Sequence, residues 1–221
     1  MRKLWLFLVA GVLAACSAAP AAPAPAPPSP SPSVSDQQRV LAAMLTRDEV
    51  AKYGLNVAQG PVSVLPNETS RPSLGKPCGQ RLASDGRISS AAQADLYTSD
   101  GDVHLQVHQV LARYRAAGTT TVQEVEQALT CSHDTDAVGL ATTVTGKISV
   151  PQAPGVERQV AYCEDDPEMG SRHCYVFAAQ GNYAMMLDFQ AVSRNRADAK
   201  KLLDQRVPAL TPALETVLSR G

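Results

Sequence analysis

The sequence has almost no excess of charge of either sign, because 20 Lys and Arg residues stand against 21 Asp and Glu residues among 221. Nucleic-acid-binding proteins neutralise phosphates with clustered basic residues, so we expect no nucleic-acid partner. The apolar run Leu4 to Leu13 is shorter than the about 20 residues that a helix needs to span a bilayer. With 44% hydrophobic and 19% charged residues, the composition excludes disorder throughout and a polytopic membrane protein.

Several common catalytic motifs are also missing. The chain has no Gly-x-Ser-x-Gly elbow, no His-Glu-x-x-His and no glycine loop of the kind that holds phosphates. His133 lies near Asp134 and Asp136, but such a spacing is too common to indicate a catalytic triad. We therefore expect that the protein is not an enzyme and uses no cofactor.

The first residues form an export leader. A basic pair, Arg2 and Lys3, precedes the apolar run, and the run ends in a Leu-Ala-Ala-Cys sequence at Cys16. This resembles the bacterial lipobox, in which a peptidase cleaves before the cysteine and the thiol then carries diacylglycerol. We expect a signal peptide at residues 1–15, lipid attachment at Cys16, and a membrane-anchored, extracytoplasmic location. A signal peptide with a chance cysteine, or an uncleaved anchor, is the alternative.

A tether and one domain follow the leader. Residues 17–35 contain 7 Pro, 6 Ala, 5 Ser and 1 Val, so we expect residues 16–35 to be a lipidated cysteine and an extended spacer. At about 3.1 Å per residue the spacer reaches at most about 60 Å, which can hold a domain clear of the membrane. Residues 36–221 are of a length that fits a single domain.

The domain alternates helical and strand patterns, which predicts an α+β fold with a largely antiparallel sheet and flanking helices. Asp36 is expected to cap a first helix, and the capping boxes at Thr46 and Thr121 two more. A final helix is expected after Ser193, with a break or kink at Pro208. Strands are expected at Val62 to Leu65, Ala91 to Thr98, Val103 to Val110, Leu140 to Val150, Glu157 to Cys163, Cys174 to Ala179 and Tyr183 to Phe189.

Two of these strands have an informative alternation. Val103, Leu105 and Val107 are expected on the core face, with His104, Gln106 and His108 outside. This spacing separates His104 from His108 by about 13 Å, so they are expected to be solvated residues rather than metal ligands. In the last strand the core-facing set is Tyr183, Met185, Leu187 and Phe189, and the set on the other face is Ala184, Met186, Asp188 and Gln190.

The four cysteines after the leader are expected to form disulfides, because export places thiols in an oxidising compartment. Three pairings are possible. Cys163 ends one strand and Cys174 begins the next, so hairpin geometry favours this pair and leaves Cys78 with Cys131.

We expect no bound metal. A zinc site would need Cys131, His133, His173 and Cys174 with free thiolates, and their spacing matches no common zinc finger. The acidic segment Glu164 to Glu168 lacks the glycine and the spacing of a calcium loop, so we expect a solvated hairpin tip.

The domain from about Leu41 to Leu218 resembles a known family. The resemblance lies in the Leu-Thr-Arg-Asp-Glu-Val segment that starts at Leu45, the region of Cys78, the helix that runs into Cys131, and the closing strands and helix. These features are similar to the extracellular sensor domain of the PknH-type mycobacterial receptor kinase, which also occurs in actinobacterial lipoproteins. The resemblance implies two disulfides, and helices that frame a cleft for an envelope ligand. It carries over no catalytic residue, and the tryptophan that often precedes the second domain cysteine is replaced here.

The sequence thus predicts a surface lipoprotein with a non-catalytic ligand-binding or sensor domain for a small molecule or envelope component. The ligand-binding residues are not assigned by the sequence. A structural or assembly lipoprotein is an alternative that predicts an exposed apolar patch. An envelope hydrolase is another, and it predicts a nucleophile, a base and an orienting acid in one cleft.

Overall fold

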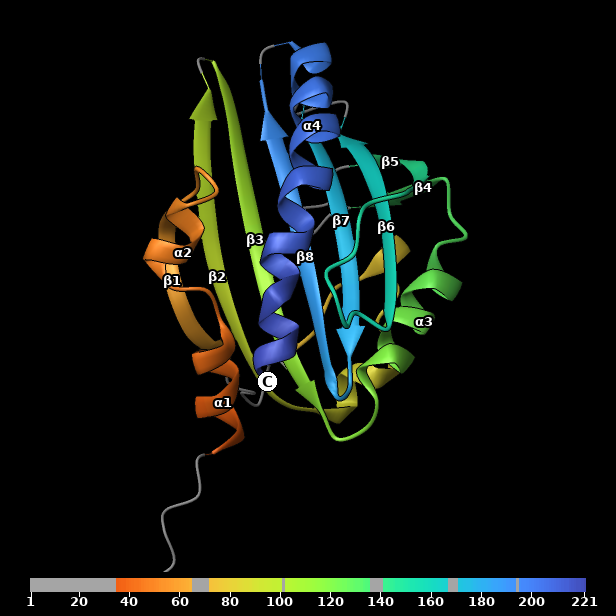
Figure 1. Cartoon of the computed structure of the whole chain (residues 1–221). Helices are drawn as coiled ribbons and strands as arrows, with labels where there is room; N and C mark the ends of the chain where they lie inside the picture. The colour runs from red at the N-terminus through yellow and green to blue at the C-terminus, as the bar shows by residue number, and fades with distance from the viewer. Residues whose placement is uncertain (1–34, 65–71, 101, 136–140, 167–170, 194) are drawn as a thin grey trace, which may run out of the picture. The chain divides into compact units, whose positions relative to one another are not determined.

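In the computed structural model, the described part of the chain covers residues 35–64, 72–100, 102–135, 141–166, 171–193 and 195–221, and it belongs to the unit Val34–Gly221. Its strands form one antiparallel sheet in the order β1-β2-β3-β8-β7-β6-β5-β4 (Figure 1). The predicted α+β fold, with a largely antiparallel sheet and flanking helices, is confirmed. The leader, Cys16 and the spacer lie outside the described residues.

The bounds of the elements are as follows. The strands are β1 Asn56–Val64, β2 Ile88–Asp100, β3 Val103–Tyr114, β4 His133–Thr135, β5 Ala141–Ile148, β6 Arg158–Asp166, β7 Ser171–Gln180 and β8 Tyr183–Val192. The α-helices are α1 Asp36–Ala43, α2 Arg47–Ala51, α3 Gly118–Ala128 and α4 Arg196–Glu215. The short 3-10 helices are η1 Pro77–Gly79, η2 Ala83–Arg87 and η3 Thr216–Arg220. Among the residues that the structure describes, no helix has the length and apolar character needed to cross a membrane.

One face of the sheet, here called the α4 face, is mostly apolar and carries the larger of two hydrophobic clusters. Figure 1 looks onto this face, which α4 crosses in front of β3, β8 and β7. The predicted alternation is confirmed, because Met185, Leu187 and Phe189 of β8 are buried in the same cluster as Leu203 and Leu214 of α4. α1 and α2 cover the β1–β2 side of the sheet.

α4 is one continuous helix through Pro208, where the sequence predicts a break or a kink, so the helix does not break there. A proline inside a helix removes one hydrogen bond and crowds the preceding turn. Here Leu203, Val207, Leu210 and Leu214 are all buried against the sheet, and this packing outweighs the local cost.

The opposite face, here called the α3 face, is packed over only part of its area. We call the packed part the covered half. It consists of Ala91, Val110, Ala112, Phe177, Ala184 and Met186. It packs under Val122 and Val125 of α3 and under Leu74 and Leu82, which flank η1 and η2. Phe177 is 1% exposed, so this half is a second hydrophobic core.

α3 begins at Gly118 rather than at the expected capping box of Thr121, which lies buried within the helix. A Cβ atom at Gly118 would lie 2.2 Å from the carbonyl oxygen of Tyr183. Glycine therefore allows α3 to approach β8 closely. The first helix likewise takes its cap from Ser35 instead of Asp36, whereas the capping box of Thr46 and Glu49 is confirmed.

The favoured cysteine pairing is confirmed. Cys163 and Cys174 lie directly opposite each other in β6 and β7, with 4.0 Å between their Cα atoms, and form one disulfide. Cys78 and Cys131 form the other, across 53 residues of sequence. This second bond ties η1 to the segment after α3, so it holds together the elements that lie over the covered half.

Candidate functional site

The rest of the α3 face on β2, β3 and β8 carries mainly polar side chains, with the partly exposed Val192 opposite His104. We call this the open half, and it consists of Asp95, Tyr97, Ser99, His104, Gln106, His108, Asp188 and Gln190. The strand register aligns these residues in rows. Asp95, His108 and Asp188 are opposite one another, and Tyr97, Gln106 and Gln190 form the next row. Sequence alternation predicts the face of the β3 and β8 residues correctly.

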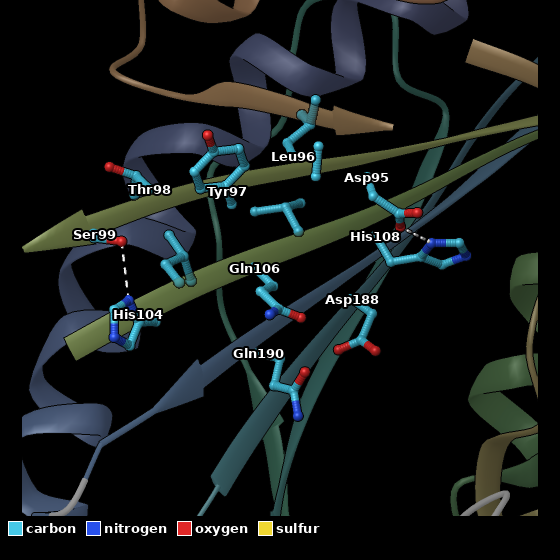
Figure 2. Close-up of a pocket in the computed structure, with 13 residues that line it drawn as sticks. Asp95, Leu96, Tyr97, Thr98, Ser99, His104, Gln106, His108, Asp188 and Gln190 are labelled. Atoms are coloured by element: carbon cyan, nitrogen blue, oxygen red, sulfur yellow. Dashed lines mark hydrogen bonds and ion pairs between the residues drawn. The ribbon is translucent and has the colours of Figure 1, made fainter. Parts of the chain in front are cut away.

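A cavity of about 380 Å³ lies at the open half. Its size falls near the lower end of the range for small-molecule sites, about 300 to 1,000 Å³. Figure 2 shows that the lining side chains come from neighbouring strands, and the lining includes both polar rows. No Lys or Arg is among the lining residues that the structure describes. The cavity therefore offers hydrogen-bonding groups and negative charge, with no strong fixed cation.

Two imidazole–carboxylate pairs order the first row. The Nδ1 atom of His108 lies 2.6 Å from Oδ1 of Asp95 (Figure 2), and the Nδ1 atom of His173 lies 3.0 Å from Oδ1 of Asp188. Each pair links adjacent strands, β3 with β2 and β7 with β8. Such bonds fix the orientation of both partners, so the open half presents its polar atoms in defined positions.

The polar row continues onto β6, where Glu164 lies opposite His173. Burial raises the pKa of Glu164 to about 7, with a further upward effect from the charge of Asp134. Burial by itself would lower the pKa of His173, but the hydrogen bond and the charge of Asp188 outweigh this, and its pKa is raised. Acids and imidazoles therefore alternate across five neighbouring strands, in a set called the polar row below: Asp95, His108, Asp188, His173 and Glu164. The set steps from the first register row to the second at Asp188, because Tyr175 is opposite Asp188 and His173 is opposite Gln190.

The environment of the acidic segment differs from the prediction. Glu164 and Asp166 were expected at a solvated hairpin tip, but they belong to β6 and are only 6% and 4% exposed. The reason is that β6 extends three residues past Cys163, which brings both side chains onto the α3 face. The rest of the expected tip, residues 167–170, lies outside the described residues.

The residues considered for metal binding do not form a metal site in the described part of the chain. Cys131 and Cys174 are both in disulfides, so neither supplies a thiolate. The described ranges contain no group of three or more His, Cys, Asp or Glu side chains placed to hold a metal ion. His104 and His108 do lie on the outer face, as predicted, and they bond to Ser99 and Asp95 respectively.

Serine, histidine and aspartate, the residue types of a hydrolytic triad, all occur in the open half, but their hydrogen bonds do not form a triad. In a triad the imidazole bonds to the acid through Nδ1 and to the serine through Nε2. Here Nδ1 of His104 bonds to Ser99 at 2.9 Å, while the aspartate bonds to a different imidazole, that of His108. His133, the other histidine considered for a triad, has Nδ1 3.5 Å from the hydroxyl of Thr143 and lies at the β4 edge.

A Ser-x-x-Lys sequence, a spacing found in some acyl-transfer enzymes, is present at Ser73 to Lys76. The hydroxyl of Ser73 lies 2.7 Å from Oδ2 of Asp85 and also bonds to the carbonyl of Gly75. These contacts fold the loop before η1, next to Leu74, which packs over the covered half. The motif therefore has a structural role here.

Comparison with known proteins finds similarity at the level of fold. The solved structure of the extracellular domain of PknH from Mycobacterium tuberculosis is similar over 80% of this chain and 96% of that chain, with a TM-score of 0.50 and 13% identity. A putative uncharacterized protein from Mycobacterium smegmatis, an Rv0999 ortholog, matches 77% of this chain and 97% of its own with a TM-score of 0.40 and 14% identity. No family model and no curated protein sequence matches. The chain thus has a fold similar to the PknH extracellular domain, as its sequence suggests.

Proposed function

We propose that this protein is a lipid-anchored, extracytoplasmic lipoprotein whose domain binds a small molecule or cell-envelope component at the open half, without catalysing a reaction. The observation that carries the proposal is the cavity of the open half, whose lining includes both rows of polar side chains. The α4 face and the covered half of the same sheet are packed under helices, so the open half is where the sheet presents ordered polar groups to a ligand.

Two further observations support the proposed location and role. Both described disulfides are of the kind that persists in oxidising compartments outside the cytoplasm. The solved structure with a similar fold is itself an extracellular domain. The disconnected His, Ser and Asp pairs described above favour binding over hydrolysis.

The alternative role as an assembly lipoprotein lacks a comparable observation. Its expected signature is a continuous exposed apolar patch. Among the described residues, the exposed large hydrophobic side chains are Tyr53, Val62, Tyr97 and Val192, and none is more than 42% exposed. Tyr97 lines the polar cavity instead of joining an apolar surface.

Binding at the open half is testable with the full chain purified in detergent. A thermal-shift screen would use small molecules that are neutral, cationic and anionic at neutral pH. We expect at least one stabilising compound whose effect is lost in Gln106→Ala with Gln190→Ala, because both amides line the cavity. Gln123→Ala, on the exposed surface of α3, is the matched control and should keep the effect. Hits that persist in the double variant would place binding elsewhere and contradict the proposal.

The lipid anchor has its own test. Cells that express the full chain would be fed an alkyne-tagged fatty acid, and the protein would be isolated from the membrane and soluble fractions. We expect label on the wild-type chain in the membrane fraction and none on Cys16→Ser, because the thiol is the acceptor. Label that remains on Cys16→Ser, or a wild-type chain without label, would contradict lipidation at this residue.

A further inference from the structure

We propose that the open half binds an uncharged, polyhydroxylated ligand, a saccharide, whose ring lies against Tyr97 and whose hydroxyl groups bond to Gln106 and Gln190. This inference rests on the proposed function, because it names the ligand class of the same site.

The first argument is the set of hydrogen-bonding groups. Gln106 and Gln190 are directly opposite each other in β3 and β8, and both line the cavity (Figure 2). Each amide offers two donor hydrogens and one acceptor oxygen. Adjacent to them, Asp95 and Asp188 contribute carboxylate acceptors. A ligand that bonds to all four must present donors and acceptors close together, and neighbouring hydroxyl groups do this because each is both donor and acceptor.

The second argument is the exposed ring of Tyr97. This side chain is 42% exposed and lies in the same row as the two amides, on the strand next to Gln106. A tyrosine ring in such a position supplies an apolar surface with a polar tip. A sugar ring also has an apolar face of C–H groups and an edge of hydroxyls. The row of one aromatic ring and two amides matches both surfaces of such a ligand.

The charges of the site argue against the other ligand classes. An anion would approach Asp95 and Asp188 with no Lys or Arg among the described lining residues to compensate, which is unfavourable. A cation would meet carboxylates that are each bonded already to an imidazole, His108 in one case and His173 in the other. The raised pKa of His173 favours its charged form next to Asp188, so this pair is closer to neutral than a free carboxylate. A neutral ligand avoids the repulsion that an anion would meet, and it does not depend on the reduced negative charge that a cation would need.

The test uses the full chain in detergent and an array of neutral, amine-bearing and acidic oligosaccharides, followed by calorimetry with the best neutral oligosaccharide. We expect binding to neutral glycans, and a loss of affinity of about tenfold or more in Tyr97→Ala and in Gln106→Ala. Tyr53→Ala is the matched control for the ring, since Tyr53 is 40% exposed and lies outside the cavity. Gln123→Ala is the control for the amide, and both controls should bind like wild type.

The other outcomes separate the ligand class from the proposed function. Binding of amine-bearing or acidic glycans in preference to neutral ones, lost in Tyr97→Ala, would overturn the ligand class and leave the binding function standing. The same holds if no glycan binds while the thermal-shift screen yields another compound that depends on Gln106 and Gln190. If neither experiment finds a ligand that depends on these residues, both proposals are wrong.

Discussion

The covered half and the open half lie on the same face of the sheet and share β2, β3 and β8. They differ in the polarity of their side chains and in whether other elements pack over them. In β3 and β8, the opposite residues Val110 and Met186 belong to the covered half. Two residues further along each strand, the opposite residues His108 and Asp188 belong to the open half. The α4 face of these strands is mostly apolar, and its buried Gln109 donates a hydrogen bond to the carbonyl of Leu214 in α4. The switch from apolar to polar side chains along these strands therefore occurs on the α3 face, and it coincides with the area that α3 leaves uncovered.

This difference shows how one sheet combines a packed core with an open polar surface, at which we propose that a ligand binds. Polar groups under a helix would lose water without gaining partners, which costs about 1 to 3 kcal/mol for each group. The covered half accordingly carries Ala, Val, Phe and Met, while the polar groups are gathered where a ligand or water can reach them. Because the strands are continuous, the packing of the covered half also fixes the backbone from which the open half extends.

The largest difference between the halves should appear on truncation of Phe177. It is 1% exposed at the centre of the covered half. We expect Phe177→Ala to lower the free energy of unfolding by about 3 to 5 kcal/mol, from lost burial and the cavity that remains. Gln106→Ala, on the exposed surface of the open half, should change it by no more than about 0.5 kcal/mol. Urea unfolding followed by circular dichroism measures both, and similar costs for the two variants would contradict the comparison.

The next largest effect should come from the Cys78–Cys131 disulfide, which links elements that lie over the covered half. We expect Cys78→Ala with Cys131→Ala to cost about 2 to 4 kcal/mol, because the unfolded chain regains the entropy of a long loop. In hydrogen exchange, α3 should lose protection more than β2 and β3 at the open half. Equal loss of protection across both halves would show that the bond stabilises the whole domain without preference for one half.

Much of the covered half and of the α4 face could be predicted from the sequence. The alternation in the last strand assigns Met185 and Leu187 to one face and Met186 to the other, because side chains in a strand have a period of two. The cysteine pairing follows from hairpin geometry in the same local way. Helix starts were less predictable, because close packing at Gly118 determines where α3 begins.

Only part of the open half could be predicted from the sequence. Its faces follow from alternation, and the Asp-Gly turn could have been used to place Asp95 opposite His108, since hairpin register follows from the turn. The contact of β3 with β8 joins segments about 80 residues apart, and no local pattern specifies that register. The polar row could not be predicted without the register of β3 against β8. The burial of Glu164 was missed for a related reason, because it depends on how far β6 extends.

The dependence of stability on pH offers a third test, confined to the polar row. The pKa of Glu164 is about 7 in the folded protein, above its ordinary value, so its ionisation opposes folding. This contribution is absent below about pH 4.5 and complete above about pH 7, so stability should fall as pH rises through this window. His173, whose pKa is also raised, adds a fall as pH rises past its unfolded value of about 6.5.

Glu164→Gln isolates the first of these contributions. We expect this variant to lose less stability than wild type between pH 5 and pH 8, by about 1 kcal/mol after allowance for solvent screening. It should keep the part of the His173 contribution that comes from Asp188, which raises the pKa of His173 more than Glu164 does. Glu157→Gln, at an exposed position, should keep the full wild-type dependence. Urea unfolding at several pH values measures this, and an equally steep fall in Glu164→Gln would show that Glu164 does not carry the effect.

The smallest expected change in stability comes from making part of the polar row apolar. His173 and Asp188 form a pair whose side chains are each 21% exposed. Replacing a mostly buried ion pair as a unit with apolar residues is often neutral, whereas removing one partner leaves the other uncompensated. We expect His173→Leu with Asp188→Leu to change the free energy of unfolding by no more than about 1 kcal/mol, and Asp188→Leu alone to cost more. Urea unfolding of the two single variants and the double variant, as a thermodynamic cycle, measures this. A double variant that costs as much as the sum of its singles would show that the two side chains do not stabilise each other, and would contradict this prediction. A near-neutral double variant that no longer binds the ligand would support the proposal that the open half keeps its polarity for recognition.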